Sequence, residues 1–283
     1  MITLPHSRGK SNDSIQAVQE LLWSKKKWSF LESCGKKCDM DWIYLSPHLD
    51  DVVLSCGGLV WEQARQGERV EIWTICAGDP PPIPLSSFAI SLQERWQTEQ
   101  HAPAQRRTED MLACQRLGVI PRYFSLSDCI YRRSPENGES LYNSELELFG
   151  EIHPAEISLV SLLIQELAQA IPRGATLVSP LTVGGHVDHR LVRAAAEGLG
   201  LPVWYYADYP YVQWLRTIPA DLVSGMKPFE FPVMDAGLAA WVESVAAYTS
   251  QISSFWFSLE DMEEEIRNYC LKNGGVQLWQ YTE

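Results

Sequence analysis

One histidine and two aspartates, His48, Asp50 and Asp51, lie within four consecutive residues of this chain. They follow an apolar run at residues 42–45 and precede residues 52–66, whose apolar spacing predicts a helix. The three side chains are therefore expected on a strand-to-helix turn at the carboxyl end of a strand, where open α/β sheets bind ligands. Imidazole and carboxylate groups can hold a metal ion or move a proton, although a single aspartate here can also simply cap the helix.

A second group of the same chemistry, His186, Asp188 and His189, occurs in the loop after another apolar run, residues 176–179. The carboxyl ends of parallel strands meet at one edge of a sheet, so both groups are expected at that edge. A mixed imidazole and carboxylate ligand set without thiolate is typical of catalytic zinc with an open water position, and non-haem iron can use the same set. The two groups together predict a shared metal site.

Strand and helix patterns alternate along the chain. The expected strands lie at residues 42–46, 70–77, 122–126, 176–179 and 203–206. The expected helices lie at residues 52–66, 91–117 with a break near Pro103, 157–171, 190–199, 236–253 and 259–272. This alternation predicts an α/β fold with a mostly parallel, Rossmann-like sheet flanked by helices. We expect a single domain over residues 1–283, with a core at about 40–210 and a C-terminal helical extension at about 235–273.

Two segments lack a regular pattern. Residues 78–87 contain four prolines, which break helix and strand alike. They follow a predicted strand, so they are expected to border the same edge as His48. Residues 128–155 form a polar excursion of a length that is often functional.

Composition limits the class of protein. The net charge of −13 opposes binding to nucleic acid or to an anionic membrane. No apolar run reaches the roughly 20 residues of a membrane span, and residues 1–10 lack the apolar segment of a signal peptide. The seven cysteines are odd in number and several lie in apolar runs, which predicts buried free thiols in a reducing compartment. We expect a cytoplasmic protein, and the sequence leaves a homo-oligomer open.

The two groups resemble the paired motifs of the PIG-L/LmbE-like zinc deacetylases, which include the N-acetylglucosaminyl-phosphatidylinositol de-N-acetylases. PHLDD at residues 47–51 is similar to the first motif, and GHVDH at residues 185–189 is similar to the second. The resemblance extends over about residues 42–253. Leu49 replaces the usual proline and Val52 the usual glutamate, but neither position supplies a ligand or the proton-transfer group in the family pattern.

The resemblance implies roles for the motif residues. A zinc ion, with another divalent metal such as Fe²⁺ left open, would be held by His48, Asp51 and His189. Asp50 would act as the general base for a water molecule that attacks an amide carbonyl. His186 would stabilise the developing oxyanion, and Asp188 would orient His186 and raise its pKa.

Three further residues are candidates for binding substrate. Arg107, with Arg106 as the alternative, could contact a hydroxyl or phosphate, and a surface ion pair with Glu109 or Asp110 is the competing interpretation. Tyr209 and Tyr211 follow the strand at residues 203–206 and could stack on a sugar or assist the oxyanion, or could serve in packing.

The sequence therefore predicts a metal-dependent hydrolase that removes an N-acetyl group from an N-acetylglucosamine-type amino sugar or its conjugate. Two alternatives stay open: a metal-dependent amidase acting on a non-sugar amide, such as a thiol conjugate or an antibiotic-like molecule, and a non-catalytic sugar-binding protein on the same fold. A dinucleotide-dependent oxidoreductase is disfavoured, because no Gly-x-Gly-x-x-Gly follows the first strand.

Overall fold

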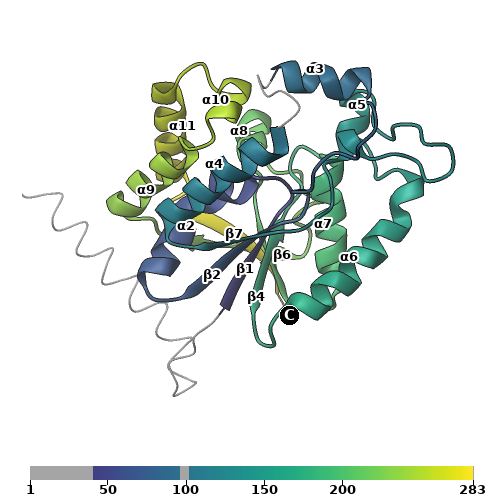
Figure 1. Cartoon of the computed structure of the whole chain (residues 1–283). Helices are drawn as coiled ribbons and strands as arrows, with labels where there is room; N and C mark the ends of the chain where they lie inside the picture. Colours follow the sequence, from purple (N-terminus) through teal and green to yellow (C-terminus); the bar gives the residue numbers. More distant parts are fainter. Residues whose placement is uncertain (1–40, 96–101, 283) are drawn as a thin grey trace, which may run out of the picture. The chain divides into compact units, whose positions relative to one another are not determined.

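The computed structural model describes residues 41–95 and 102–282, which are built around a seven-stranded sheet (Figure 1). In sheet order, the strands are β3 (Ile120–Tyr123), β2 (Arg69–Thr74), β1 (Asp41–Ser46), β4 (Thr176–Pro180), β5 (Val203–Tyr206), β7 (Val276–Tyr281) and β6 (Met226–Phe231). The first five are parallel to one another, and β7 and β6 continue the sheet in antiparallel pairing. The predicted α/β fold with a mostly parallel sheet is confirmed.

The strand order reverses between β1 and β4. From β1 the chain passes through α2 (Asp51–Arg65) to β2 on one side, and from β4 it passes through α7 (Val187–Gly198) to β5 on the other. Such a switch point opens a crevice at the carboxyl ends of the two central strands. The loops that carry His48 and His186 leave the sheet at this point.

Helices cover both faces of the sheet, which explains why residues 42–45 of β1 are all apolar. Tyr44 of β1 packs into one hydrophobic cluster, whereas Ile43 and Leu45 pack into another. The first cluster includes residues of α2, α4 (Ala102–Leu117), α9 (Asp235–Val245), α10 (Thr249–Phe255) and α11 (Leu259–Lys272). The second includes residues of α6 (Ile157–Ala170) and α7, on the opposite side of the sheet in Figure 1. A strand buried on both faces cannot show polar alternation.

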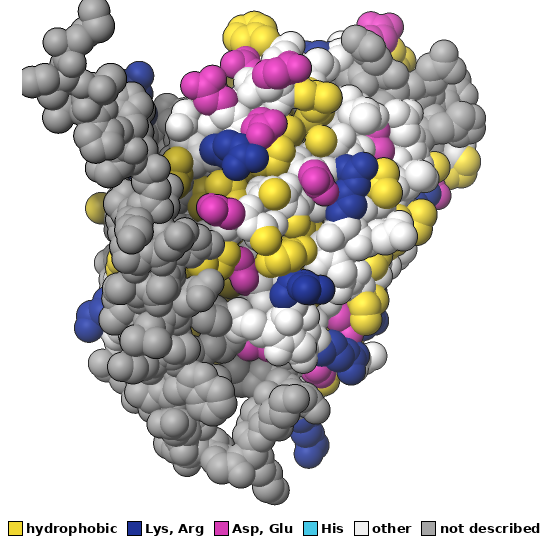
Figure 2. Space-filling model, turned by 90° about the vertical axis from the view of Figure 1, so that its left-hand side faces the viewer, with side chains coloured by type: hydrophobic (Ala, Val, Ile, Leu, Met, Phe, Trp, Pro, Cys, Tyr) yellow, Lys and Arg dark blue, Asp and Glu magenta, His cyan; other side chains and the backbone are white. Residues whose placement is uncertain are grey.

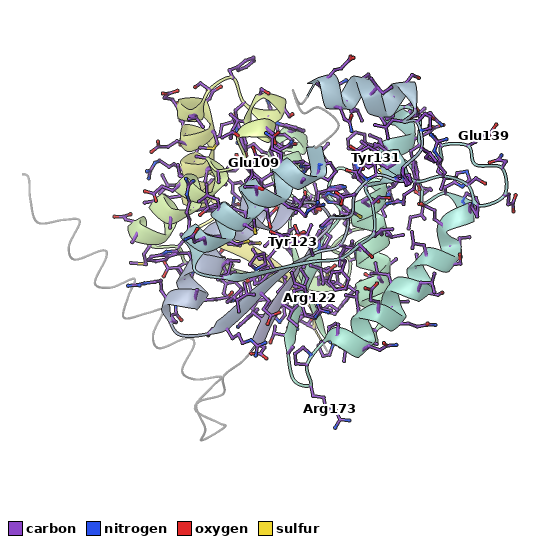
Figure 3. The ribbon with its side chains drawn as sticks, in the orientation of Figure 1. Glu109, Arg122, Tyr123, Tyr131, Glu139 and Arg173 are labelled. Atoms are coloured by element: carbon purple, nitrogen blue, oxygen red, sulfur yellow. The ribbon has the colours of Figure 1, made fainter. Side chains whose placement is uncertain are left out.

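Close packing fixes α2, whose first turn carries Asp51. A Cβ atom added at Gly57 would lie 2.5 Å from Cδ1 of Trp241, so α9 can approach α2 this closely only beside glycine. The indole N–H of Trp241 donates to the main-chain oxygen of Val53 at 2.7 Å. On the neighbouring helix α4, Glu109 (Figure 3) accepts hydrogen bonds from the start of α10.

The excursion predicted at residues 128–155 is ordered into short elements over the carboxyl edge of the sheet. These are η2 (Cys129–Tyr131), α5 (Glu145–Leu148) and η3 (Pro154–Glu156). Together with α3 (Ser87–Arg95) they form a third, smaller hydrophobic cluster. In Figure 3, Tyr131 of η2 lies toward this edge, and Arg173, in the connection before β4, lies toward the opposite one.

Several predicted boundaries were wrong. The antiparallel strands β6 and β7 were missed, since β6 is an edge strand that contains Pro228 and alternates weakly. The helix predicted at 236–253 is divided into α9 and α10. Helix α7 begins three residues before the predicted 190, because His186 caps it through its side chain. Pro103, where a break was predicted in the helix at 91–117, lies in the first turn of α4. Residues 96–101 and 1–10 lie outside the described residues.

The remaining predictions concern surface charge, membrane-spanning helices and the state of the cysteines. In Figure 2, Lys and Arg side chains lie among acidic and apolar ones, so the described part of this face carries no basic patch. Among residues 41–95 and 102–282, no helix has both the length and the apolar character needed to cross a bilayer. The cysteines of these residues are free and buried, as predicted: Cys56, Cys76, Cys114, Cys129 and Cys270.

Candidate active site

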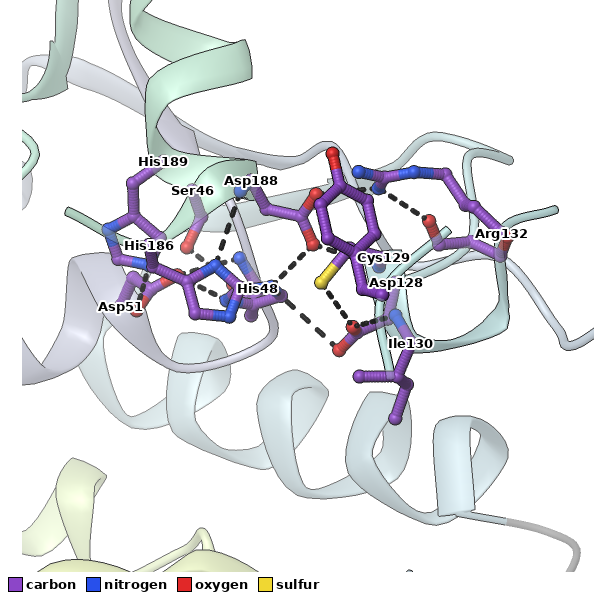
Figure 4. A network of polar contacts seen from close by, with 12 residues as sticks. Ser46, His48, Asp51, Asp128, Cys129, Ile130, Arg132, His186, Asp188 and His189 are labelled. Atoms are coloured by element: carbon purple, nitrogen blue, oxygen red, sulfur yellow. Dashed lines mark hydrogen bonds and ion pairs between the residues drawn. The ribbon is translucent and has the colours of Figure 1, made fainter. Parts of the chain in front are cut away.

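Three histidines meet at the switch point of the sheet. His48 follows β1, while His186 and His189 occupy the cap and the first turn of α7. One ring nitrogen of each lies within 4.8 Å of the others, and all three side chains are shown together in Figure 4. The structure thus brings together the two groups of residues that are far apart in the sequence.

Asp51 lies between two of these imidazoles. One carboxylate oxygen is 3.3 Å from Nδ1 of His48 and the other is 3.4 Å from Nε2 of His189. Burial alone would raise the pKa of Asp51, but the two histidines outweigh it and hold the pKa well below its usual value. Asp51 is therefore a carboxylate with an imidazole nitrogen on each side.

The outer ring nitrogens of the same two histidines contact buried aspartates. Nε2 of His48 is 3.0 Å from Asp188, and Nδ1 of His189 is 2.5 Å from Asp208. An ionised carboxylate can only accept, so the outer nitrogens donate to Asp188 and Asp208. Burial alone would lower the pKa of both histidines, but the surrounding carboxylates outweigh it, holding the pKa of His48 well above its usual value and raising that of His189 to about 9. Nε2 of His189 is buried and makes no hydrogen bond.

That arrangement fits a metal ion. A metal ion bound here would take the place of the protons on the inner nitrogens, and two imidazoles and a carboxylate would then supply its ligands. A carboxylate behind each imidazole fixes the ring orientation, as in many metal sites. Asp208 was missed by the sequence analysis. The signal that could have found it is its position directly after β5, at the same edge as the other two groups.

Asp188 is held from outside the histidine cluster by a buried arginine. Nη1 of Arg132 donates to one oxygen of Asp188 at 2.5 Å, and Nε and Nη2 of the same guanidinium donate to Glu156 at 2.5 and 3.0 Å. The other oxygen of Asp188 accepts from His48 and from the main-chain N–H of Cys129 at 3.0 Å. The excursion is thus tied to the histidine cluster by buried charges (Figure 4).

The contacts of His186 differ from those that the resemblance implied. The carboxylate of Asp188 contacts His48 instead, and only the main-chain N–H of Asp188 bonds to His186, at Nδ1 and 3.2 Å. Burial and the neighbouring His48 hold the pKa of His186 well below its usual value, rather than raised. The imidazole is therefore neutral, with its proton on Nε2.

Asp50 is buried beside Asp51 and His48 without capping α2. Its side chain makes no capping hydrogen bond, so the interpretation as a simple helix cap does not hold. Burial raises the pKa of Asp50 to about 6, although the guanidinium of Arg106, 3.4 Å away, opposes the shift. A carboxylate with a pKa close to neutral is suited to accepting and releasing a proton.

The two arginines considered for substrate have different surroundings. Arg107 donates to the main-chain oxygen of Ala77 at 2.7 Å and to Asp79 at 2.8 Å. Arg107 therefore forms a surface ion pair, as the competing interpretation held, but with the exposed Asp79 in place of Glu109 or Asp110. Arg106, the alternative, is the one that contacts Asp50.

The two tyrosines also separate. Tyr209 is 1% exposed, and its ring packs in the core against Trp256 and Tyr269, with centroids 6.2 and 4.8 Å away. It is placed there because its main-chain N–H bonds to a side chain of α2. Tyr211 lies at the site, with its ring centroid 6.0 Å from that of His189.

Two other groups of side chains could hold a cation. They are Cys129 with His186 and Asp188, and His48 with Asp128 and Asp188. Both depend on Asp188, whose oxygens are already engaged by a guanidinium, an imidazole and a main-chain N–H. The inward-facing nitrogens beside Asp51 have no such competition.

Comparisons with known proteins agree with this geometry. The family model for GlcNAc-PI de-N-acetylase, PIG-L, matches residues 43–199. A 2'-N-acetylparomamine deacetylase of Niallia circulans is 32% identical over 188 residues, 60% of this chain and 67% of that protein. One of Streptomyces fradiae is 31% identical over 249 residues, covering 84% and 80%. The zinc-inhibited form of a teicoplanin deacetylase superposes with a TM-score of 0.72 at 27% identity, over 85% of this chain and 97% of that one.

Proposed function

This chain belongs to the PIG-L family of GlcNAc-PI de-N-acetylases, and from that premise we propose that it is a metal-dependent hydrolase that removes the N-acetyl group of an amino sugar. The observation that carries the proposal is the inward-facing, buried and unbonded Nε2 of His189 opposite His48 and Asp51, with Asp50 beside them.

His48 through Nδ1, Asp51 through its carboxylate and His189 through Nε2 would hold the metal ion. Zinc is the first candidate for this ligand set, and ferrous iron is the second. When bound, a divalent cation at this site supplies Lewis acidity that activates water and polarises an amide carbonyl. Asp188 and Asp208 keep the two imidazoles in the tautomers that this binding requires.

Asp50 is the proton-transfer group. It takes a proton from the water that adds to the acetamide carbon, and it returns the proton to the nitrogen as the C–N bond breaks, which releases acetate and the free amine. His186 is the oxyanion group, because its neutral imidazole presents an Nε2–H donor to the carbonyl oxygen as charge develops there.

Within the amino sugars, we propose a substrate of the 2'-N-acetylparomamine type, in which the acetylated sugar is linked to an aminocyclitol. The support is the identity to two deacetylases of that compound and the net charge of −13, which suits a cationic substrate. A glycopeptide-linked N-acetyl amino sugar is the second candidate, since a teicoplanin deacetylase shares the fold over 85% of this chain. A location in the cytoplasm and a single domain over residues 1–283 stay predictions, and a homo-oligomer stays open.

The test compares wild type with Asp50→Asn after both have been loaded with the same metal. We expect acetate release from 2'-N-acetylparomamine to fall by about 10²–10⁴-fold, the usual contribution of a proton-transfer group, with the metal content unchanged. Asp79→Asn, which alters an exposed aspartate, is the matched control and should turn over as wild type does. Undiminished turnover by metal-loaded Asp50→Asn would remove Asp50 from the mechanism, and full turnover after chelation would refute the metal site.

A further inference from the structure

Aromatic rings continue outward from the catalytic histidines. We call Phe149, Tyr211, Trp214 and Phe255 the aromatic shelf. The ring centroid of Phe149 lies 5.6 Å from that of His186 and 6.0 Å from that of Tyr211. Trp214 lies 5.5 Å from Tyr211 and 6.1 Å from Phe255. The line of rings thus begins in contact with the proposed oxyanion group.

Two members of the aromatic shelf are open to solvent, one beside His186 and one farther along the line of rings. Trp214 is 52% exposed and Phe149 is 43% exposed, whereas Trp73 and Trp241 of the core are almost completely buried. An exposed aromatic side chain does not gain the free energy that burial would supply. Exposed aromatic side chains grouped next to a reaction centre are typical of a surface that a ligand covers.

The aromatic shelf is fixed to the loop that carries His186. Gly184 has φ of +94°, and a Cβ atom there would lie 2.8 Å from Cγ of Tyr211, so this ring packs directly on the loop backbone. Tyr211 opens α8 (Tyr211–Leu215), and the same short helix presents Trp214. The position of Trp214 relative to the histidines is therefore set by packing within the site.

We propose that the aromatic shelf is the subsite for the ring next to the acetylated sugar, and that this ring is an amino sugar or aminocyclitol. The inference rests on the proposed deacetylase function. The face of an aromatic ring carries negative charge density, which attracts the ammonium groups of such a ring. The acidic chain as a whole adds to that attraction.

The experiment compares two substrates and two readouts. Trp214→Ala should raise KM for 2'-N-acetylparomamine by about 5–20-fold, the size of a cation–π contact, and leave kcat/KM for N-acetylglucosamine within about two-fold. Trp214→Phe should restore most of the loss. Phe229→Ala removes a similarly exposed aromatic side chain on β6, whose ring neighbours Trp204 outside the aromatic shelf, and should leave both substrates unaffected.

Binding of paromamine, measured by calorimetry, separates this inference from the proposed function. If the wild type releases no acetate but binds paromamine through Trp214, the deacetylase proposal fails and the subsite stands. The subsite is overturned if the wild type does not bind paromamine, if Trp214→Ala binds it as tightly as wild type, or if the variant loses both substrates equally. A thermal melt shows whether Trp214→Ala is folded, and Trp214→Phe provides the same test in case it is not.

Discussion

Two histidine–aspartate pairs lie on either side of the candidate metal site, His48 with Asp188 and His189 with Asp208. In each pair the outer ring nitrogen donates to a buried carboxylate, so the inner nitrogen is available to a metal ion. The two pairs do the same for the site, but the rest of the protein holds their carboxylates in different ways.

Asp188 is held by charge, whereas Asp208 is held by the backbone. Beyond its histidine, Asp188 accepts from the guanidinium of Arg132 and from one main-chain N–H, and the arginine outweighs burial to keep the pKa of Asp188 well below its usual value. Beyond its histidine, Asp208 accepts from the main-chain N–H of Val183 at 2.8 Å. Burial dominates there and raises the pKa of Asp208. The support of His48 therefore depends on the excursion, while that of His189 comes from the adjacent loops after β4 and β5.

The largest loss of stability is expected from removing Arg132, whose positive charge supports Asp188 but not Asp208. Arg132→Met leaves Asp188 and Glu156 as buried carboxylates without their cation, and removing one partner of such a group typically costs about 3–5 kcal/mol. We expect the free energy of unfolding, measured in urea, to fall by that amount. The neighbouring Arg133→Met should lose about 1 kcal/mol, because Arg133 bonds only to main-chain oxygens among its described contacts. Equal losses in the two variants would show that the buried charges are not the support.

Replacing each carboxylate by an amide compares the two pairs directly. All groups that Asp188 and Asp208 contact through their side chains are donors, three for Asp188 and two for Asp208, so an asparagine NH₂ must face a donor in either variant. Replacing a residue that hydrogen-bonds to a metal-binding histidine typically reduces metal affinity by about 10–100-fold. We expect the loss of metal affinity to be about 100-fold in Asp188→Asn and about 10-fold in Asp208→Asn. Competition with a chromophoric chelator measures both affinities.

The control for both amides is Asp128→Asn. The Asp128 carboxylate is 3.8 Å from Nε2 of His48, beyond hydrogen-bond distance, so its loss should change metal affinity by about two-fold or less. A larger loss in Asp208→Asn than in Asp188→Asn would reverse the ranking of the two supports.

The sequence predicted the two turns that carry His48 and His189, because local patterns encode them. An apolar run, a turn with His48 and a helical period identify a strand-to-helix connection, and the same holds for His189. Since parallel strands end at one edge, the meeting of the two turns followed from topology alone.

The supports could not be predicted in this way. The contact of Arg132 with Asp188 joins the excursion to α7, and no periodicity records a pairing between segments so far apart. Tyr209 and Tyr211 are two residues apart after the same strand, yet one packs in the core and the other at the site. That choice depends on a main-chain bond from Tyr209 to α2, which is a tertiary contact.

The smallest effect tests how far the support of His48 extends into the excursion. The hydroxyl of Tyr142 donates to Glu156 at 2.7 Å and accepts the main-chain N–H of His153 at 2.9 Å. Tyr142→Phe should lower the free energy of unfolding by about 1–2 kcal/mol, since it removes the bond to Glu156 and the acceptor of the His153 N–H. Metal affinity should change by about two-fold or less, because Arg132 keeps both of its bonds to Glu156. A loss of affinity as large as that of Asp188→Asn would instead mean that His48 is oriented by the excursion as a whole, with Arg132 as only one of its contacts.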